Sequence, residues 1–299
     1  MKRPLVSTLA VALLGAATLV GGAAAPAGAA ERPAASAERA DTGGGESRGG
    51  AELPLAAPDF EGTVALSNCS GSVVRTADSQ PGDPALVLSN GHCLEGGMPE
   101  PGTVLVDQPS SRSFTLLDAG GADAGTVNAT KLAYATMTGT DVSLYQVDAS
   151  YEEIEAQHGV QALELDSARP KESSAITVVS GYWKETYSCD IDGFVHELRE
   201  GGWTMKDSIR YTEACETKGG TSGSPIVDDV SGKVVGVNNT GNENGGECTM
   251  NNPCEVDENG EVTVRPGTNY GQQTYQITSC VGEGNTVDLS LPECALPKP

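Results

Sequence analysis

After residue 58 the apolar residues of this chain come in short runs that turn signals separate. Four such runs occupy residues 84–88, 103–106, 175–179 and 233–237. Each run is rich in Val, Leu or Ile, and turn motifs flank such runs, among them Ser231-Gly232 and Glu258-Asn259-Gly260. Short β-rich runs with turns between them are typical of antiparallel barrels and sandwiches, not of alternating strands and helices. The pattern therefore predicts an all-β fold, with one short helix at residues 151–158.

The first 58 residues have a different composition. Residues 1–30 hold Lys2 and Arg3, an apolar stretch over 5–20 and a run of small residues at 27–29, which is the layout of a secretory signal. Residues 31–58 contain few large apolar residues and are predicted to be a disordered linker or short propeptide. No later stretch approaches the ~18 apolar residues of a membrane helix. We therefore expect a secreted, extracellular protein without membrane attachment once the signal is removed.

The chain is strongly acidic, with a formal net charge of −23 at pH 7. An acidic surface opposes phosphate binding and favours solubility outside the cell. We therefore expect no nucleic-acid partner, whereas the same charge could attract basic substrates.

All eight cysteines lie after the predicted linker. They are Cys69, Cys93, Cys189, Cys215, Cys248, Cys254, Cys280 and Cys294. An even number in an exported chain indicates disulfides. A zinc site is the alternative, but there is no Cys-x-x-Cys pair with a matching second pair or histidines. The acidic turn at 257–261 lacks the spacing of an EF-hand loop and is predicted to be a hairpin turn, so we expect no metal and no other cofactor.

Three residues in the order His92, Asp141, Ser222 form a candidate catalytic set. His92 follows the apolar run that ends at Asn90-Gly91, Asp141 precedes an alternating strand at 142–147, and Ser222 lies in the glycine-rich motif of residues 219–225. A serine hydroxyl becomes a nucleophile when a base takes its proton, and that base needs a carboxylate to hold its tautomer. Each residue alone could belong to an ordinary surface turn. The acids that compete with Asp141 are Asp123, Asp148 and Asp166.

The order of the three residues and their motifs resemble the chymotrypsin-like (trypsin-like) serine peptidases. The motifs are Asn-Gly-His-Cys at 90–93, Gly-Thr-Asp-Val-Ser-Leu at 139–144 and a Ser-Gly-Ser-Pro nucleophile motif at 222–225, which secreted bacterial members and glutamyl endopeptidases also have. The resemblance covers residues 59–285. It implies two packed, antiparallel, six-stranded β-barrels, at about 59–155 and 172–285, with a tail to residue 299 and the active site in the cleft between the barrels.

The resemblance also implies roles for particular residues. His92 would be the general base, Asp141 its carboxylate partner and Ser222 the nucleophile, with the backbone N–H groups of Gly220 and Ser222 forming the oxyanion hole. It pairs Cys69 with Cys93. For the remaining cysteines we predict the pairs Cys189–Cys215, Cys248–Cys254 and Cys280–Cys294.

The chain departs from the family pattern at two places. Thr221 stands where trypsin has the aspartate that pairs with a newly cut N-terminus, so activation would come from loss of residues 31–58 or from folding alone. Asn238 occupies the position of the substrate-reading histidine of glutamyl endopeptidases, so a preference for Glu is not expected. The backbone near Asn239 and Gly241 could pair with an extended peptide.

One acidic residue could bind a basic side chain of the substrate. Glu216 lies six residues before Ser222, where trypsin has the acid at the floor of its specificity pocket, and would suit Arg or Lys at the cleaved bond. It could equally pair with Lys218 at the surface. The two tryptophans, Trp183 and Trp203, are expected in the core or at the rim.

The function predicted from these observations is that of a secreted serine endopeptidase that acts as a monomer on proteins or peptides through an acyl-enzyme. Because the working form of His92 is neutral, activity should fall as the pH drops below roughly 6.5. Two alternatives remain: a binding protein with an inactive peptidase fold, and a serine esterase without useful proteolysis.

Overall fold

The computed structural model describes residues 57–299. The predicted signal at 1–30 and nearly all of the predicted linker lie outside the described residues. Within the described part of the chain, no helix is both long and apolar enough to cross a membrane.

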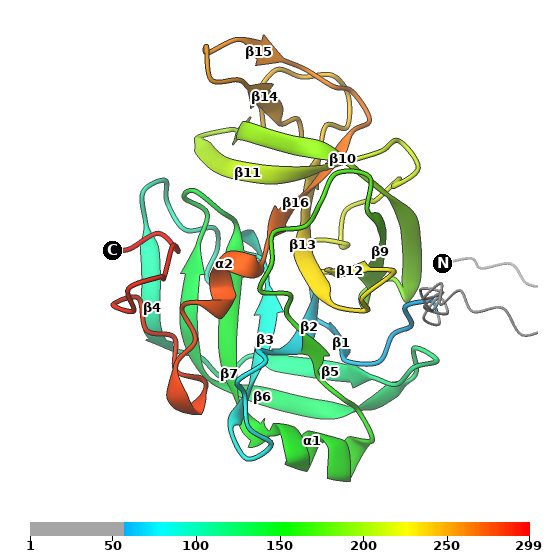
Figure 1. Ribbon diagram of the computed structural model, residues 1–299, viewed down its shortest axis with the longest axis vertical. Helices are drawn as coiled ribbons and strands as arrows, with labels where there is room; N and C mark the ends of the chain where they lie inside the picture. The colour runs from blue at the N-terminus through cyan, green and yellow to red at the C-terminus, as the bar shows by residue number, and fades with distance from the viewer. Residues whose placement is uncertain (1–56) are drawn as a thin grey trace, which may run out of the picture. The chain divides into compact units, whose positions relative to one another are not determined.

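Six antiparallel strands close the first barrel (Figure 1). In chain order the strands are β1 (Thr63–Ala65), β2 (Ser70–Arg75), β3 (Pro84–Ser89), β5 (Ser113–Leu117), β6 (Asp123–Thr136) and β7 (Val142–Ser150). Hydrogen bonding runs β1-β5-β6-β7-β3-β2 and returns from β2 to β1, which closes the ring. Two further strands, β4 (Val104–Pro109) and β8 (Leu163–Glu164), pair with β6 and β2 from outside the ring.

The second barrel repeats this arrangement. Its strands are β9 (Ala175–Ser180), β10 (Glu185–Glu200), β11 (Trp203–Tyr211), β12 (Pro225–Asp228), β13 (Val234–Gly241) and β16 (Asn269–Gln273). They follow the order β11-β16-β13-β12-β9-β10, and β10 pairs with β11 to close the ring. Two short strands, β14 (Cys254–Val256) and β15 (Val262–Thr263), extend from β10. The structure thus confirms the predicted all-β fold of two six-stranded antiparallel barrels.

The helices are short. The first, α1 (Tyr151–His158), coincides with the predicted helix, and a capping box between Ser150 and Glu153 begins it. It ends at Gly159, whose φ of 66° is a conformation that glycine adopts without strain. The others are η1 (Gly91–Cys93), α2 (Tyr275–Thr278) and η2 (Glu283–Asn285).

A shared apolar layer packs the barrels against each other. In β3, Ala85 and Val87 face the interior of the first barrel, whereas Leu86 and Leu88 join a cluster that also contains Val179 and Val237 of the second barrel. Because successive side chains of a strand point to opposite faces, β3 is buried on both sides. Because both faces of β3 are buried, apolar residues follow one another with no polar residue between them, which explains the unbroken apolar run at 84–88.

After β16 the chain returns to the first barrel. Tyr134 donates a hydrogen bond to the carbonyl of Pro297 at 3.0 Å, and Asn285 donates one to the carbonyl of Pro84 at 2.9 Å. Leu296 is buried in the same apolar layer that joins the barrels. The segment 275–299 therefore packs on the first barrel, and the last strand of the second barrel ends at Gln273.

The eight cysteines form four disulfides. The pairs are Cys69–Cys93, Cys189–Cys215, Cys248–Cys254 and Cys280–Cys294, as predicted. In the described chain the only group spaced for a metal is Cys69, His92 and Cys93, whose two thiols are joined in a disulfide. The acidic segment 257–261 connects β14 to β15, and Asp257 accepts hydrogen bonds from the N–H groups of Asn259 and Glu261 at 2.8 Å. It is the hairpin turn that the sequence predicted.

Candidate active site

Strand pairing brings His92 and Asp141 to the same end of the first barrel. Strands β3 and β7 are antiparallel neighbours, with Ser89 opposite Ser143. His92 follows β3 in the turn η1, and Asp141 directly precedes β7. Only glycine fits at position 91, because a Cβ there would collide with the carbonyl group of Thr136.

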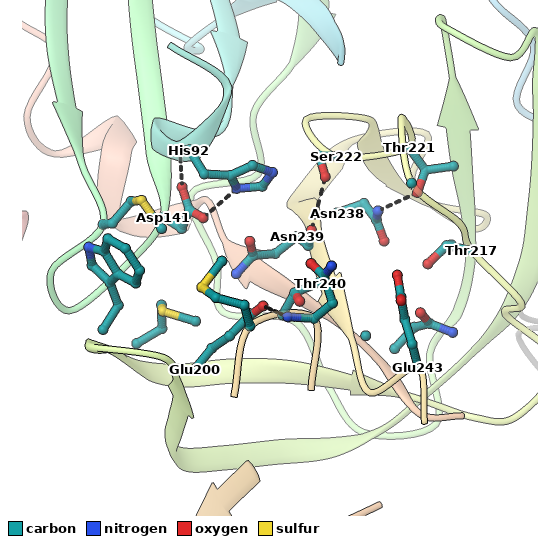
Figure 2. Close-up of a pocket in the computed structure, with 18 of the residues that line it drawn as sticks. His92, Asp141, Glu200, Thr217, Thr221, Ser222, Asn238, Asn239, Thr240 and Glu243 are labelled. Carbon is teal, nitrogen blue, oxygen red and sulfur yellow. Dashed lines mark hydrogen bonds and ion pairs between the residues drawn. The ribbon is translucent and has the colours of Figure 1, made fainter. Parts of the chain in front are cut away.

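Asp141 holds His92 by two hydrogen bonds. Its Oδ2 lies 2.7 Å from His92 Nδ1, and its Oδ1 accepts the His92 backbone N–H at 3.0 Å (Figure 2). The Asp141 residue is 1% exposed, so solvent screens this pair only weakly. A proton on Nδ1 would leave Nε2 as the basic nitrogen. Figure 2 shows the imidazole extending from Asp141 toward Ser222.

The surroundings of His92 raise its pKa above the ordinary value of 6.5. Burial on its own lowers the pKa of His92, since it disfavours the charged ring. The charge of Asp141, its hydrogen bond to the ring and the charge of Glu200 together outweigh that effect. A positive charge on the imidazole is therefore well accommodated at this position.

Ser222 lies at the tip of a tight loop after Lys218. Its carbonyl accepts the N–H of Ser70 at 2.8 Å, and the next residue, Gly223, has a φ of 82°. A side chain on Gly223 would collide with the carbonyl of Ser70, so both conformation and space require glycine there. The Ser222 hydroxyl donates to the carbonyl of Asn239 at 3.2 Å and makes no hydrogen bond to His92 in this structure.

Side chains of neighbouring residues donate hydrogen bonds to two carbonyl groups of this loop. Trp183 Nε1 donates to the carbonyl of Gly219 at 2.8 Å, and Ser70 Oγ donates to the carbonyl of Gly220 at 3.2 Å. The C=O of Gly219 and the N–H of Gly220 point to opposite sides of one trans peptide plane. The bond from Trp183 therefore turns the Gly220 N–H away from Trp183. Within the described chain, the N–H groups of Gly220 and Ser222 have no acceptor.

A buried polar network supports the same loop from inside. Thr221 Oγ1 donates to the carbonyl of Lys218 at 2.6 Å and accepts from Asn238 Nδ2 at 3.0 Å. Asn238 Oδ1 in turn accepts the hydroxyl of Tyr211 at 3.1 Å. Thr221 thus anchors the loop by neutral hydrogen bonds. Both polar atoms of Asn238 already have protein partners, which leaves this side chain little capacity to bind a substrate directly.

One cleft contains most of the predicted site residues. His92, Asp141, Ser222, Asn238, Asn239 and Gly241 all line it. Glu216 is exposed and does not line the cleft, whereas the three residues that follow it, at 217–219, do. Lys218 pairs with Glu185 at 2.7 Å. This arrangement therefore does not support the hypothesis that Glu216 binds an Arg or Lys side chain of the substrate.

One residue of the cleft was not singled out from the sequence. Glu200, the last residue of β10, is 8% exposed and lines the cleft. A lone acid in an acidic chain carries no local signal, and only the long-range packing of β10 brings Glu200 to the cleft. Trp183, which was expected in the core or at the rim, is 43% exposed and binds the Ser222 loop through its indole N–H.

Comparison with known proteins gives one family match and several distant structures. No curated protein matches the sequence significantly. Similar solved structures include the MamO protease domain from Magnetospirillum magneticum (12% identity, TM-score 0.47, covering 76% of this chain and 98% of that one). Others are the active form of the Rv3671c protease from M. tuberculosis (14%, 0.44, 81% and 84%) and a Glu endopeptidase in complex with MPD (15%, 0.41, 74% and 89%). At these identities the similarity does not extend to activity or specificity. The model of the trypsin-like peptidase domain matches residues 69–237, more than half of the sequence, and the chain therefore belongs to the trypsin-like peptidase domain family.

Proposed function

We propose that this protein is a secreted serine endopeptidase in which Ser222 is the nucleophile, His92 the general base and Asp141 its partner. One observation carries the proposal: the His92–Asp141 pair faces Ser222 in one cleft, and the neighbouring N–H groups of Gly220 and Ser222 have no acceptor among residues 57–299. A basic nitrogen, a hydroxyl and two free donors are the parts that acyl transfer requires.

The reaction begins when the Ser222 side chain turns from the Asn239 carbonyl toward His92. Hydrogen bonds of this kind are often loose in a free enzyme and tighten when substrate binds. His92 Nε2 takes the hydroxyl proton while Oγ attacks the peptide carbonyl, and the Gly220 and Ser222 N–H groups hold the oxyanion. His92 then gives the proton to the leaving amine, and water releases the acyl group from Ser222.

The substrates are proteins or peptides, as membership of a peptidase family implies. Strand β12 pairs with β13 only as far as Val237, so residues 239–241 of β13 pair with β16 on one side and with no described strand on the other. An extended peptide can add to such an edge by main-chain hydrogen bonds. Four disulfides and the predicted signal support export, since disulfides persist in oxidising compartments. We propose that the protein acts as a monomer.

Fluorophosphonate labelling tests the function directly. The purified mature protein is expected to react, and peptide mass spectrometry should locate the adduct at Ser222, while heat-unfolded protein stays unlabelled. Folded protein that takes up no label would contradict the proposal and favour a binding protein. Labelling together with turnover of small esters, but of no peptide or protein, would indicate an esterase.

The pH profile should reflect the raised pKa of His92. Because the base must be neutral, kcat/KM is expected to be low at acidic pH and to rise to a plateau as the pH passes the pKa of His92 in the free enzyme. Since Asp141 and Glu200 raise that pKa, the midpoint should lie above 6.5. Initial rates between pH 4 and 9 measure it. A midpoint below 6.5 in protein that remains folded would contradict this electrostatic description.

Removing the indole N–H of Trp183 should weaken the oxyanion hole. In Trp183→Phe a smaller aromatic ring replaces the indole, the Gly219 carbonyl loses its donor, and the Gly220 N–H is no longer held in one direction. Loss of a whole oxyanion donor costs about 10²- to 10³-fold in kcat, and we expect about 10-fold here because the donor remains but is less well oriented. KM should change little. The control is Tyr182→Phe, which keeps the neighbouring ring; equal effects of the two variants would contradict the role of Trp183.

A further inference from the structure

Glu200 is a buried acid without a basic partner. Its Oε1 accepts the N–H of Asn251 at 2.7 Å, and no Lys or Arg between residues 57 and 299 forms an ion pair with it. Glu255 is equally buried, yet it pairs with both Arg210 and Arg265. Burying a carboxylate is costly in free energy unless the carboxylate is paired with a cation. Glu255 has such a partner, and Glu200 does not.

The surroundings of Glu200 raise its pKa above the ordinary value, which disfavours the charged form. Burial raises the pKa of Glu200, whereas hydrogen bonds from Thr240 and Asn251 and the charge of a protonated His92 lower it. The nearby charge of Asp141 acts in the same direction as burial. A cation that enters the cleft would oppose the effect of burial and favour the ionised form.

The walls beside Glu200 are apolar. Met98, Met137, Trp203, Met205 and Met250 line the same cleft, and together with Glu200 we call them the methionine recess. Methionine side chains adapt their shape to a flexible partner, and Lys and Arg combine an apolar stem with a charged head. The recess thus offers apolar contact for such a stem and a carboxylate for its head.

The recess is built from both barrels and is held in place. Trp203 Nε1, on the β10–β11 hairpin, donates to the carbonyl of Pro99 at 2.8 Å. The N–H of Gly139, two residues before Asp141, donates to the carbonyl of Thr204 at 2.9 Å. These bonds fasten the hairpin that carries Glu200 to the barrel that carries His92, so the position of Glu200 relative to His92 is fixed.

The recess lies on one side of the open edge of β13. Figure 2 shows Glu200 on the same side of Ser222 as His92 and Asp141, while Thr217 and Glu243 lie on the other side. Successive side chains of an added strand point to opposite sides. The cleaved residue is the substrate residue whose carbonyl Ser222 attacks. If its side chain enters the part of the cleft beside Thr217, the side chain of the preceding substrate residue points toward Glu200.

We infer that Glu200 and the methionine recess form a binding subsite for a Lys or Arg side chain at the substrate residue that directly precedes the cleaved one. This inference rests on the proposed peptidase function and gives it a substrate class: peptides with a basic residue at that position. The earlier hypothesis for Glu216 was different, because it concerned the side chain of the cleaved residue and not that of the residue before it.

The test begins with digestion of a peptide library, with the cleaved bonds identified by mass spectrometry. We expect Lys and Arg to be enriched at the residue before the cleaved one. Two fluorogenic peptides are then made with the preferred cleaved residue, one with Lys and one with norleucine before it. Norleucine keeps the apolar stem and lacks the charge. The wild type should hydrolyse the Lys peptide with a kcat/KM about 10- to 100-fold higher, in line with a hydrogen bond to a charged group.

Glu200→Gln isolates the charge, because the amide oxygen can still accept the Asn251 N–H. At a pH on the plateau of the pH profile, where His92 is neutral in both proteins, we expect the Lys peptide to lose about 10- to 100-fold in kcat/KM and the norleucine peptide to stay within about threefold. Glu243→Gln removes the same charge from an exposed residue of the same cleft and should leave the ratio of the two peptides unchanged.

The outcomes separate the two proposals. If the protein binds fluorophosphonate and cleaves peptides but shows no basic preference at that position, or if Glu200→Gln keeps the wild-type ratio, the subsite is wrong and the peptidase function stands. If neither labelling nor cleavage occurs, both proposals fall. Should Glu200→Gln fail to fold, the library preference of the wild type decides by itself.

Discussion

Replacing Ser222 with alanine is expected to reduce kcat for peptide hydrolysis by about 10⁵- to 10⁶-fold while the protein stays folded. The hydroxyl is partly buried, and its single hydrogen bond in the free protein is to the carbonyl of Asn239. Its removal therefore costs little stability but eliminates the atom that forms the acyl-enzyme. The small remaining rate would come from binding and from the N–H groups of Gly220 and Ala at position 222, which the substitution retains.

Ser224 provides a matched control for this experiment. It lies in the same motif, is fully buried, and its hydroxyl has no hydrogen-bond partner among the described residues. Ser224→Ala should therefore retain kcat within about tenfold of the wild type, since no group that contacts the reacting atoms is lost. Thermal unfolding and initial rates of both variants give the comparison. If Ser222→Ala retained the wild-type rate, Ser222 would not be the nucleophile.

Asp141→Asn should lower kcat by about 10⁴-fold. An amide at this position can donate a hydrogen bond to His92 Nδ1, which would favour the tautomer with the imidazole proton on Nε2, where the free lone pair is needed. It would also remove the charge that raises the pKa of His92. The midpoint of the residual pH profile should accordingly move to lower pH. Because the amide has nearly the shape of the carboxylate, the fold should be unchanged.

The aspartates that competed with Asp141 in the sequence supply the control. Asp123 is exposed and pairs with Lys184 at 2.9 Å, so Asp123→Asn should change kcat less than twofold. Steady-state rates and the rate of fluorophosphonate labelling should fall together in Asp141→Asn. A variant that kept the wild-type rate and pH midpoint would show that His92 works without this carboxylate.

The sequence was sufficient for features that depend on neighbouring residues. The capping pattern at Ser150 and Glu153 marks α1, and the doubly buried run at 84–88 marks β3. The predicted partners His92 and Asp141 meet because each adjoins one of two paired strands, β3 and β7. Strand ends and turn residues are set by local conformational preferences, and these can be read along the chain.

Tertiary structure determined which of the acidic residues Glu200 and Glu216 faces the cleft. Glu216 was chosen by its spacing from Ser222, but in a loop the direction of a side chain depends on what its neighbours bury, and here the buried residue is Cys215, bonded to Cys189. Glu200 reaches the cleft only because the β10–β11 hairpin packs against Pro99 and Gly139 of the other barrel. The sequence alone determined the all-β fold and the candidate triad, whereas the disulfide pairs beyond Cys69–Cys93 were decided by the structure. The acid that faces the cleft was determined by contacts between residues far apart in the chain, whose geometry no local pattern encodes.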